Sequence, residues 1–365
     1  MNMKTCFTII VCSLFLVIAS HATIVAQEAT FEQPELTGRF QPKNVFDIKN
    51  VVNTKTSVSL VVGDGGTGPY KAVLANDWSL TEHTLYRPQN LSAFGGKTKL
   101  PVVIEGNGGC ANSSEQLAGF LAEIASHGFL VIAVGPIKDV VFGMDGRGRT
   151  ESKALLAAMD WAEARNNDPE SPYYQKIDTG NIAVMGQSCG GLQALTVSSD
   201  PRVKTTVALN SGVFASPPSL PPNMSPENSP GGGEAPRMSM PDVQKSDLKN
   251  LHAPVIYLVG GKTDIATANA EDDFTHIEKI PVFLASYDFS DSPKTTETSS
   301  AGMNIGIGHY PATYLEPHGG DFGVAAVAWL KWQLKGDPHA ANMFRGNPCG
   351  LEKNSKWTVS KKNID

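Results

Sequence analysis

A serine set among closely spaced glycines is the feature of this sequence that most suggests chemistry. The segment GQSCGG (186–191) directly follows a short apolar run, 181–185, and precedes a segment with helical spacing. In this context the glycines fit a sharp turn between a strand and a helix, because a Cβ at their positions would collide with the neighbouring strand and helix. Such a turn strains the serine and exposes its hydroxyl above the sheet. We therefore predict that Ser188 is a nucleophile.

A serine nucleophile needs a base, and the base needs an acid that orients it. Where a serine nucleophile lies at a turn between a strand and a helix, the acid follows a later strand of the same sheet. Asp264 has this position, because it ends the segment GGKTD (260–264) directly after an apolar run. Asp272 and Asp273 are weaker candidates, since we expect them on the next helix as solvated charges.

The base is expected in a loop between the last strand and the last helix. His309 ends the small-residue segment GIGH (306–309) and fits this place. His318, nearer the start of the helix, is the alternative, and His339 is expected on the surface beyond it. The sequence thus predicts a triad of Ser188, His309 and Asp264.

An oxyanion hole needs one backbone N–H from the residue after the nucleophile and one from the loop after an early strand. Cys189 would supply the first. The segment GNGGC (106–110) follows the apolar run LPVVIE, and its glycines allow close approach to a substrate oxygen. We expect the second donor to be Gly109 or Cys110, with Gly108 as a further possibility.

These assignments place two cysteines beside one cavity. We hypothesise that Cys110 and Cys189 form a disulfide that holds both oxyanion donors, the alternative being two buried free thiols. Cys349 would then be an unpaired thiol near the C-terminus.

The segments around these residues alternate between strand-like and helix-like patterns. This alternation predicts an α/β fold with a mostly parallel central sheet, helices on both faces and an antiparallel edge at the N-terminal end. The expected strands are 57–62, 71–74, 83–87, 100–105, 129–134, 181–185, 203–209, 254–259 and 281–286. The expected helices are 113–127, 150–165, 190–198 and one that begins at 325.

Residues 1–26 have the features of a secretory signal: a positive start, an apolar stretch and small residues near its end. Cleavage is expected after Ala22 or Ala26, and an uncleaved N-terminal anchor is the alternative. The remaining 27–365 are expected to form a single domain, interrupted by a Pro/Gly/Ser-rich insertion at 216–250 and a second at 288–303.

The composition is that of an ordinary globular protein. The chain has 365 residues, 41% of them apolar and 18% charged, with a net charge of -6. It has no run rich in Lys and Arg, so we expect no nucleic-acid partner. No later segment is long and apolar enough for a bilayer, so no membrane partner is expected after signal cleavage, and the location is secreted or periplasmic.

The sequence resembles the α/β hydrolases related to dienelactone hydrolases, cutinase-like polyester hydrolases and platelet-activating-factor acetylhydrolases. The resemblance runs from about residue 57 to 350 and rests on GNGGCANSSEQLAGFLAEIASHGFLVIAV, IDTGNIAVMGQSCGG, GGKTDIA and the late Gly-His. It implies the α/β-hydrolase fold, the triad roles already given, and an oxyanion role for Cys189. It implies no metal or organic cofactor.

The chain departs from these relatives at three places. Its oxyanion loop lacks the aromatic residue usual in polyester hydrolases, it carries the insertion at 216–250, and the loop before His309 is extended. These departures favour a small ester over a polymer. The nucleophile position holds Ser rather than the Cys of dienelactone hydrolases.

We therefore expect a secreted serine hydrolase that cleaves a small or polymer-borne carboxylic ester through an acyl-enzyme. A secreted peptidase or amidase on the same fold is the alternative, followed by a hydrolase-like binding protein that has lost catalysis.

Overall fold

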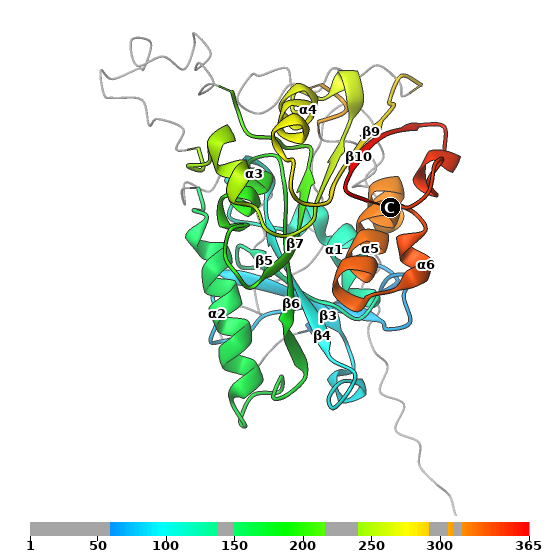
Figure 1. Ribbon diagram of the computed structural model, residues 1–365. Coiled ribbons are helices and arrows are strands. Elements are labelled where there is room, and N and C mark those ends of the chain that lie inside the picture. The colour runs from blue at the N-terminus through cyan, green and yellow to red at the C-terminus, as the bar shows by residue number, and fades with distance from the viewer. Residues whose placement is uncertain (1–58, 138–148, 216–239, 292–305, 310–315, 365) are drawn as a thin grey trace, which may run out of the picture.

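A central sheet of ten strands, covered by helices on both faces, forms the described part of the chain (Figure 1). The expected signal segment, most of the insertion at 216–250 and most of the insertion at 288–303 lie outside the described residues. The computed structural model describes residues 59–137, 149–215, 240–291, 306–309 and 316–364.

The strand order is β1-β2-β3-β5-β4-β6-β7-β8-β9-β10. The strands are β1 (Ser59–Val61), β2 (Ala72–Ala75), β3 (His83–Pro88), β4 (Leu100–Gly106), β5 (Leu130–Val134), β6 (Ile177–Gln187), β7 (Val203–Leu209), β8 (Val255–Val259), β9 (Val282–Tyr287) and β10 (Trp357–Lys362). The run from β5 to β9 is parallel, whereas β1, β2 and β3 at one edge and β10 at the other pair in antiparallel fashion.

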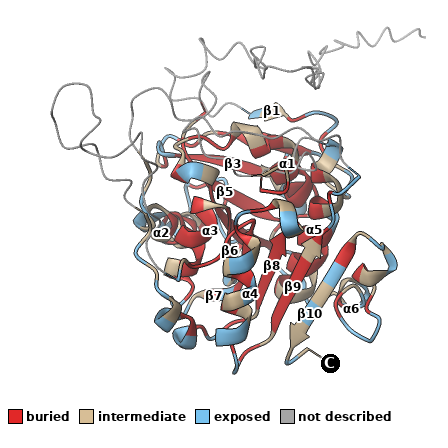
Figure 2. Cartoon of the chain, turned by 90° about the horizontal axis from the view of Figure 1, so that it is seen from above, coloured by how far each residue is buried: buried red, intermediate tan, exposed pale blue. Residues whose placement is uncertain are grey.

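The parallel strands are buried because helices cover both of their faces (Figure 2). Every residue of β4, β5 and β8 is buried. Apart from Glu105 in β4, their sequences are apolar runs rather than alternating patterns, as expected for strands with two covered faces.

The helices divide between the two faces. The helices α1 and α5 pack on one face, with α6 against α5, and α2, α3 and α4 pack on the other. Their bounds are α1 (Ala118–Ser126), α2 (Lys153–Asn167), α3 (Cys189–Val197), α4 (Thr267–His276), α5 (Gly320–Lys335) and α6 (Pro338–Ala341). Short 3-10 turns are η2 (Leu91–Ala93), η3 (Gly108–Cys110), η4 (Glu115–Leu117), η8 (Lys245–Asn250), η9 (Gly261–Thr263), η11 (Pro317–Gly319) and η12 (Leu351–Lys353).

The fold class predicted from the sequence is confirmed, including the antiparallel edge at the N-terminal end. Several elements differ from the prediction. The helix α5 begins at Gly320 rather than at residue 325, β6 begins at Ile177 rather than at 181, and the expected helix 113–127 is divided into η4 and α1. Neither α6 nor β10 was predicted. The strand β10 adds to β9 at the far edge and covers it, so both ends of the parallel sheet are closed by antiparallel pairs.

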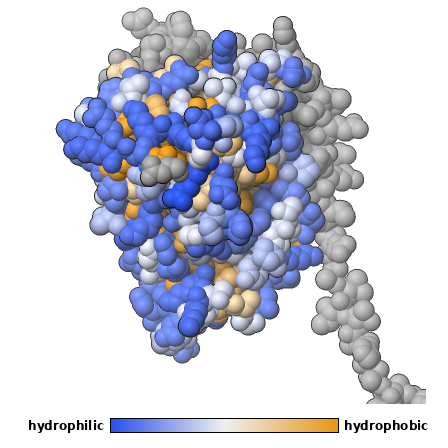
Figure 3. Space-filling model, turned by 45° about the vertical axis from the view of Figure 1, so that its right-hand side comes forward, coloured by the Kyte–Doolittle hydropathy of each residue, from blue (hydrophilic) through white to orange (hydrophobic). Residues whose placement is uncertain are grey.

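The face drawn in Figure 3 is largely hydrophilic, and apolar side chains form small, separate areas on it. Large apolar side chains that are clearly exposed include Trp78, Val324 and Ile265. No helix within the described residues is both long and apolar enough to span a bilayer.

Candidate active site

Ser188 stands at the sharp turn between β6 and α3. Its backbone has φ 52° and ψ -118°, a conformation that is strained for a residue with a side chain. A Cβ on Gly186 would meet the backbone of Gly190, and a Cβ on Gly190 would meet the backbone of Gly106 in the neighbouring strand β4. The predicted reason for the glycines is therefore confirmed: they let strand, turn and helix approach closely.

The structure brings the three residues of the predicted triad together. Oγ of Ser188 lies 2.8 Å from Nε2 of His309, and Nδ1 of His309 lies 2.7 Å from Oδ1 of Asp264. These distances are those of strong hydrogen bonds. His309 and Asp264 are each 6% exposed, so their bond is shielded from water. The arrangement can pass a proton from the serine hydroxyl to an imidazole held by a carboxylate.

Asp264 is held by more than the imidazole. Its Oδ1 also accepts the backbone N–H of Ala266 at 2.8 Å, and its Oδ2 accepts Gly260 N–H at 2.9 Å and the Asn210 side-chain amide at 2.8 Å. Four donors around one buried carboxylate fix the direction of its two oxygens.

The two other late histidines lie elsewhere. His318 is in η11, where its Nδ1 lies 3.2 Å from a carboxylate oxygen of Glu123 and its Nε2 lies 3.4 Å from one of Asp64. His339 is exposed on α6, as the sequence predicted. Neither residue is near Ser188 by any contact among the described residues.

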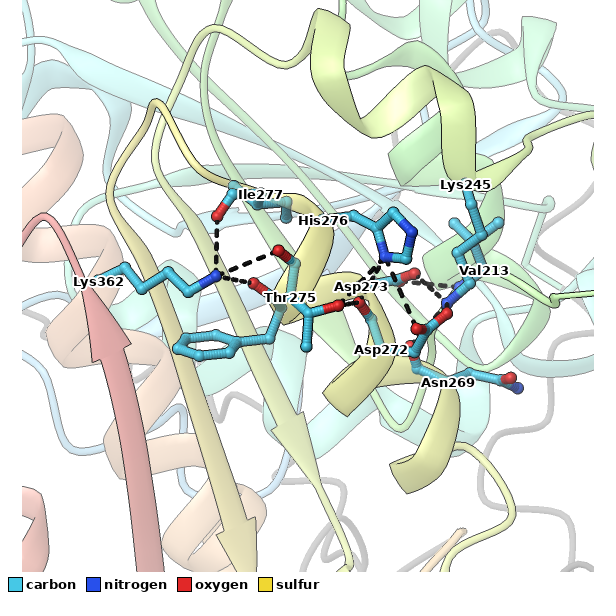
Figure 4. Close-up of polar contacts among 10 residues, drawn as sticks. Val213, Lys245, Asn269, Asp272, Asp273, Thr275, His276, Ile277 and Lys362 are labelled. Carbon is cyan, nitrogen blue, oxygen red and sulfur yellow. Dashed lines mark hydrogen bonds and ion pairs between the residues drawn. The ribbon is translucent and has the colours of Figure 1, made fainter.

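The prediction that Asp272 and Asp273 are both solvated was wrong for Asp273. Its side chain is fully buried, with Oδ1 at 2.6 Å from Nζ of Lys245 and Oδ2 accepting the Val213 N–H at 2.8 Å (Figure 4). Asp273 is buried because it lies on the face of α4 that packs on the sheet. Burial raises the pKa of Asp273 to about 6, against the opposing effect of Lys245. Asp272 is half-exposed and pairs with Lys245 at 2.7 Å.

The predicted disulfide between Cys110 and Cys189 is present, with a Cα–Cα distance of 5.1 Å. It joins the turn η3 directly to the first residue of α3. Cys349 is a buried free thiol, also as predicted. The bond therefore couples the two segments in which oxyanion donors were expected.

The loop 106–110 forms a tight turn beside the start of α3, to which the disulfide joins it. Gly109 adopts φ 64°, which glycine reaches at little cost. The Cys110 N–H already donates to the Asn107 carbonyl at 3.0 Å, so it would have to share its proton with a substrate oxygen. The Asn107 side-chain amide donates to the carbonyls of Ala111 and Val134, which ties the loop to β5.

Two residues that sequence reasoning missed hold the triad loops in place. Gln187 Nε2 donates to the His309 carbonyl at 2.8 Å, and Asn210 Nδ2 donates to the Gly308 carbonyl at 2.8 Å as well as to Asp264. Both are polar residues at the carboxyl ends of buried strands, β6 and β7. That position was the available signal, since ligands and catalytic groups in open α/β sheets gather at this edge.

Comparison with known proteins points to one group. Residues 74–212 match the model of the PET hydrolase-like (PETase) family. Cutinase 2 of Thermobifida cellulosilytica is 30% identical over 127 residues, which are 34% of this chain and 43% of the cutinase. Cutinase cut1 of Thermobifida fusca is also 30% identical over 127 residues, 34% of this chain and 35% of that cutinase.

The matched region has clear limits. The chain spans less than half the length of the curated relatives it matches. The family match contains Ser188 and both disulfide cysteines, whereas Asp264 and His309 lie beyond it. The chain has the α/β-hydrolase fold, and over residues 74–212 it is similar to PET hydrolase-like proteins and to cutinases.

Proposed function

We propose that this chain is an exported serine hydrolase that cleaves carboxylic esters through a covalent acyl-enzyme. The observation that carries the proposal is the chain of two short contacts, Ser188 Oγ to His309 Nε2 at 2.8 Å and His309 Nδ1 to Asp264 Oδ1 at 2.7 Å. The similarity to cutinases and to PET hydrolase-like proteins supports an ester as the substrate.

In the first half-reaction, Ser188 Oγ attacks the ester carbonyl while His309 Nε2 takes the hydroxyl proton. Asp264 accepts the Nδ1–H of His309 and stabilises the imidazolium. The tetrahedral intermediate then collapses, and His309 returns the proton to the leaving alcohol. An ester-linked acyl group remains on Ser188.

In the second half-reaction, His309 takes a proton from a water molecule. The water oxygen attacks the acyl carbonyl, and a second tetrahedral intermediate forms. Its collapse releases the carboxylic acid and returns the proton to Ser188. Every step uses only side chains of this chain, backbone amides and water.

Two backbone N–H groups are assigned as hydrogen-bond donors to the oxyanion of both intermediates. One is the N–H of Cys189, and the other is that of Gly109 or Cys110. The disulfide between Cys110 and Cys189 supports this pairing, because it keeps the two donor segments at a fixed separation. It also supports export, since such bonds persist in oxidising compartments.

Hydrolysis of a p-nitrophenyl ester series, acetate to decanoate, tests the proposal. We expect the purified protein to be active and Ser188→Ala to lose at least about 10³-fold in kcat/KM. A fluorophosphonate probe should label Ser188 in the parent protein alone. A folded protein without activity towards any of these esters would contradict the proposal.

Two further substrates refine the assignment. An aryl anilide matched to the best ester separates an esterase from an amidase or peptidase, and we expect the ester to be strongly preferred. A polyester film tests whether the substrate is polymer-borne. Release of soluble products from the film by the parent protein, and not by Ser188→Ala, would extend the proposal to polymers.

A further inference from the structure

Two consecutive residues before α2, Arg149 and Thr150, donate hydrogen bonds to the loop that is assigned to the oxyanion site. Nε of Arg149 donates to the Gly109 carbonyl at 2.8 Å. The backbone N–H of Thr150 donates to the Cys110 carbonyl at 2.9 Å, and its Oγ1 donates to the same oxygen at 3.0 Å. Two successive carbonyls of the loop are therefore held from one side.

The same pair also touches the helix that begins at the nucleophile. Nη2 of Arg149 lies 3.4 Å from Sγ of Cys189. In α3, Nε2 of Gln193 donates to the Thr150 carbonyl at 2.8 Å and lies 3.2 Å from its Oγ1. Arg149 and Thr150 thus connect the loop 106–110 with α3, in addition to the disulfide.

The guanidinium of Arg149 makes its contacts with a backbone carbonyl and a sulfur atom rather than with a carboxylate of the described residues. Among the described residues, no carboxylate lies within ion-pair distance of its guanidinium, and its Nη1 is buried without a hydrogen-bond partner. Burial lowers its pKa, but a guanidinium remains protonated in proteins. A partly buried cation gains less for folding from contacts with a backbone carbonyl and a sulfur atom than ion pairing would give, whereas a role at the neighbouring site uses those contacts directly.

The chemistry of the contact indicates that role. The Gly109 carbonyl and the Cys110 N–H belong to one peptide group. A charged donor on the carbonyl polarises that group and strengthens its N–H as a donor. The guanidinium also places positive charge against the residue whose N–H is the other assigned donor, Cys189. Both effects favour negative charge on a substrate oxygen.

We propose that Arg149 is a positioning residue of the oxyanion site, which fixes and polarises the Gly109–Cys110 peptide beside the Cys189 N–H. The inference rests on the proposed function. Arg149 is not expected to touch the substrate, because it acts through the backbone N–H donors that it positions. Its contribution therefore grows as the carbonyl oxygen becomes an anion, and the transition state gains more than the bound ester.

The test compares Arg149→Gln and Arg149→Lys with a matched control, Arg165→Gln. Arg165 is also a partly buried arginine with an unpartnered Nε, but it lies in the last turn of α2 and pairs with Asp168 at 3.0 Å. We expect Arg149→Gln to lower kcat roughly tenfold to a hundredfold, less than the loss of a whole oxyanion donor, with KM changed less than about threefold. Arg149→Lys should retain an intermediate kcat, and Arg165→Gln the parental value.

Phenylboronic acid supplies a readout that a merely structural role would not move. It forms a tetrahedral adduct on a reactive serine and so mimics the anionic intermediate. Its affinity should fall in Arg149→Gln by about the same factor as kcat/KM, while the affinity for phenol, a neutral aryl ligand, stays constant. Unchanged kcat, or a fall in kcat without a matching fall in boronate affinity, would overturn the inference.

Two controls keep the outcomes distinct. If Arg149→Gln does not fold, the same comparison of kcat with boronate affinity in Arg149→Lys decides the matter. An active parent protein with an unaffected Arg149 variant contradicts this inference alone. An inactive, folded parent protein contradicts the proposed function, and the inference with it.

Discussion

Gln187 donates its side-chain amide to the backbone carbonyl of His309 at 2.8 Å, so the residue that precedes Ser188 holds the loop that carries the imidazole. Gln187 is 3% exposed, and its Oε1 lies against Gly108 of the loop 106–110. One side chain thus lies between the nucleophile turn, the histidine loop and the glycine-rich loop.

Replacing Gln187 with Leu should therefore reduce activity. The change keeps most of the volume but leaves the His309 carbonyl without this donor, at a stability cost of about 1–3 kcal/mol. We expect kcat to fall on the order of tenfold, because small errors in the placement of a catalytic group are costly. Steady-state kinetics and thermal unfolding measure both effects. Gln89→Leu, at an exposed position, is the control, and equal kcat in the two variants would refute the role of Gln187.

Asp264→Asn should be far more damaging than Asp272→Asn. The Asp264 carboxylate accepts the His309 Nδ1–H, and an amide in its place would favour the wrong imidazole tautomer. The expected loss in kcat approaches 10⁴-fold. Asp272 is half-exposed, and the partners that it has among the described residues, Lys245 and His276, lie away from Ser188, so its substitution should leave kcat unchanged. Retention of more than a tenth of the activity by Asp264→Asn would remove Asp264 from the triad.

Loss of the disulfide should lower stability and activity together. The joined cysteines are 79 residues apart, and closing a loop of this length contributes up to about 4 kcal/mol through the unfolded state. The double variant Cys110→Ala/Cys189→Ala should therefore unfold at lower urea concentration and show a smaller kcat.

Alkylation in denaturant without reductant checks the bond itself. Of Cys110, Cys189 and Cys349, only Cys349 should be modified in the parent protein. Modification of either of the other two would show that the bond does not form.

The sequence allowed the site to be assembled because the α/β topology is regular. The turn at 186–191, Asp264 and His309 each follow a recognisable apolar strand or precede a recognisable helix, and parallel strands end at a common edge. Three residues more than 40 positions apart could therefore be placed together without coordinates. The glycines at the turn added a steric argument that the structure reproduces.

The residues that support the site could not be predicted from the sequence in the same way. Whether Gln187 turns towards His309, or Arg149 towards Gly109, depends on how loops from distant parts of the chain fold over one another. Burial of Asp273 depends on which face of α4 meets the sheet, and the short helix carries few apolar residues that would indicate it. The strand β10 has a mixed sequence, WTVSKK, because only one edge and part of one face are covered.

Glu105 is a buried acid for which the described structure provides no partner. It is fully buried near the end of β4, directly before the loop 106–110, and neither carboxylate oxygen accepts a hydrogen bond. Burial raises its pKa to about 8 from an ordinary value of 4.5. The carboxyl group is therefore neutral in the folded protein at pH 7, whereas it is ionised in the unfolded chain.

This difference predicts a pH-dependent stability. Between pH 4.5 and 8 the folded state binds one more proton at Glu105 than the unfolded state, so the free energy of unfolding falls as the pH rises, by about 1.4 kcal/mol per pH unit. Glu105→Gln cannot ionise and removes this slope, while all other titrating groups remain common to both proteins. Urea unfolding at several pH values should show similar stabilities near pH 5 and an advantage for Glu105→Gln that grows towards pH 8. Parallel curves for the two proteins would mean that a polar partner or water stabilises the ionised carboxylate in the folded state.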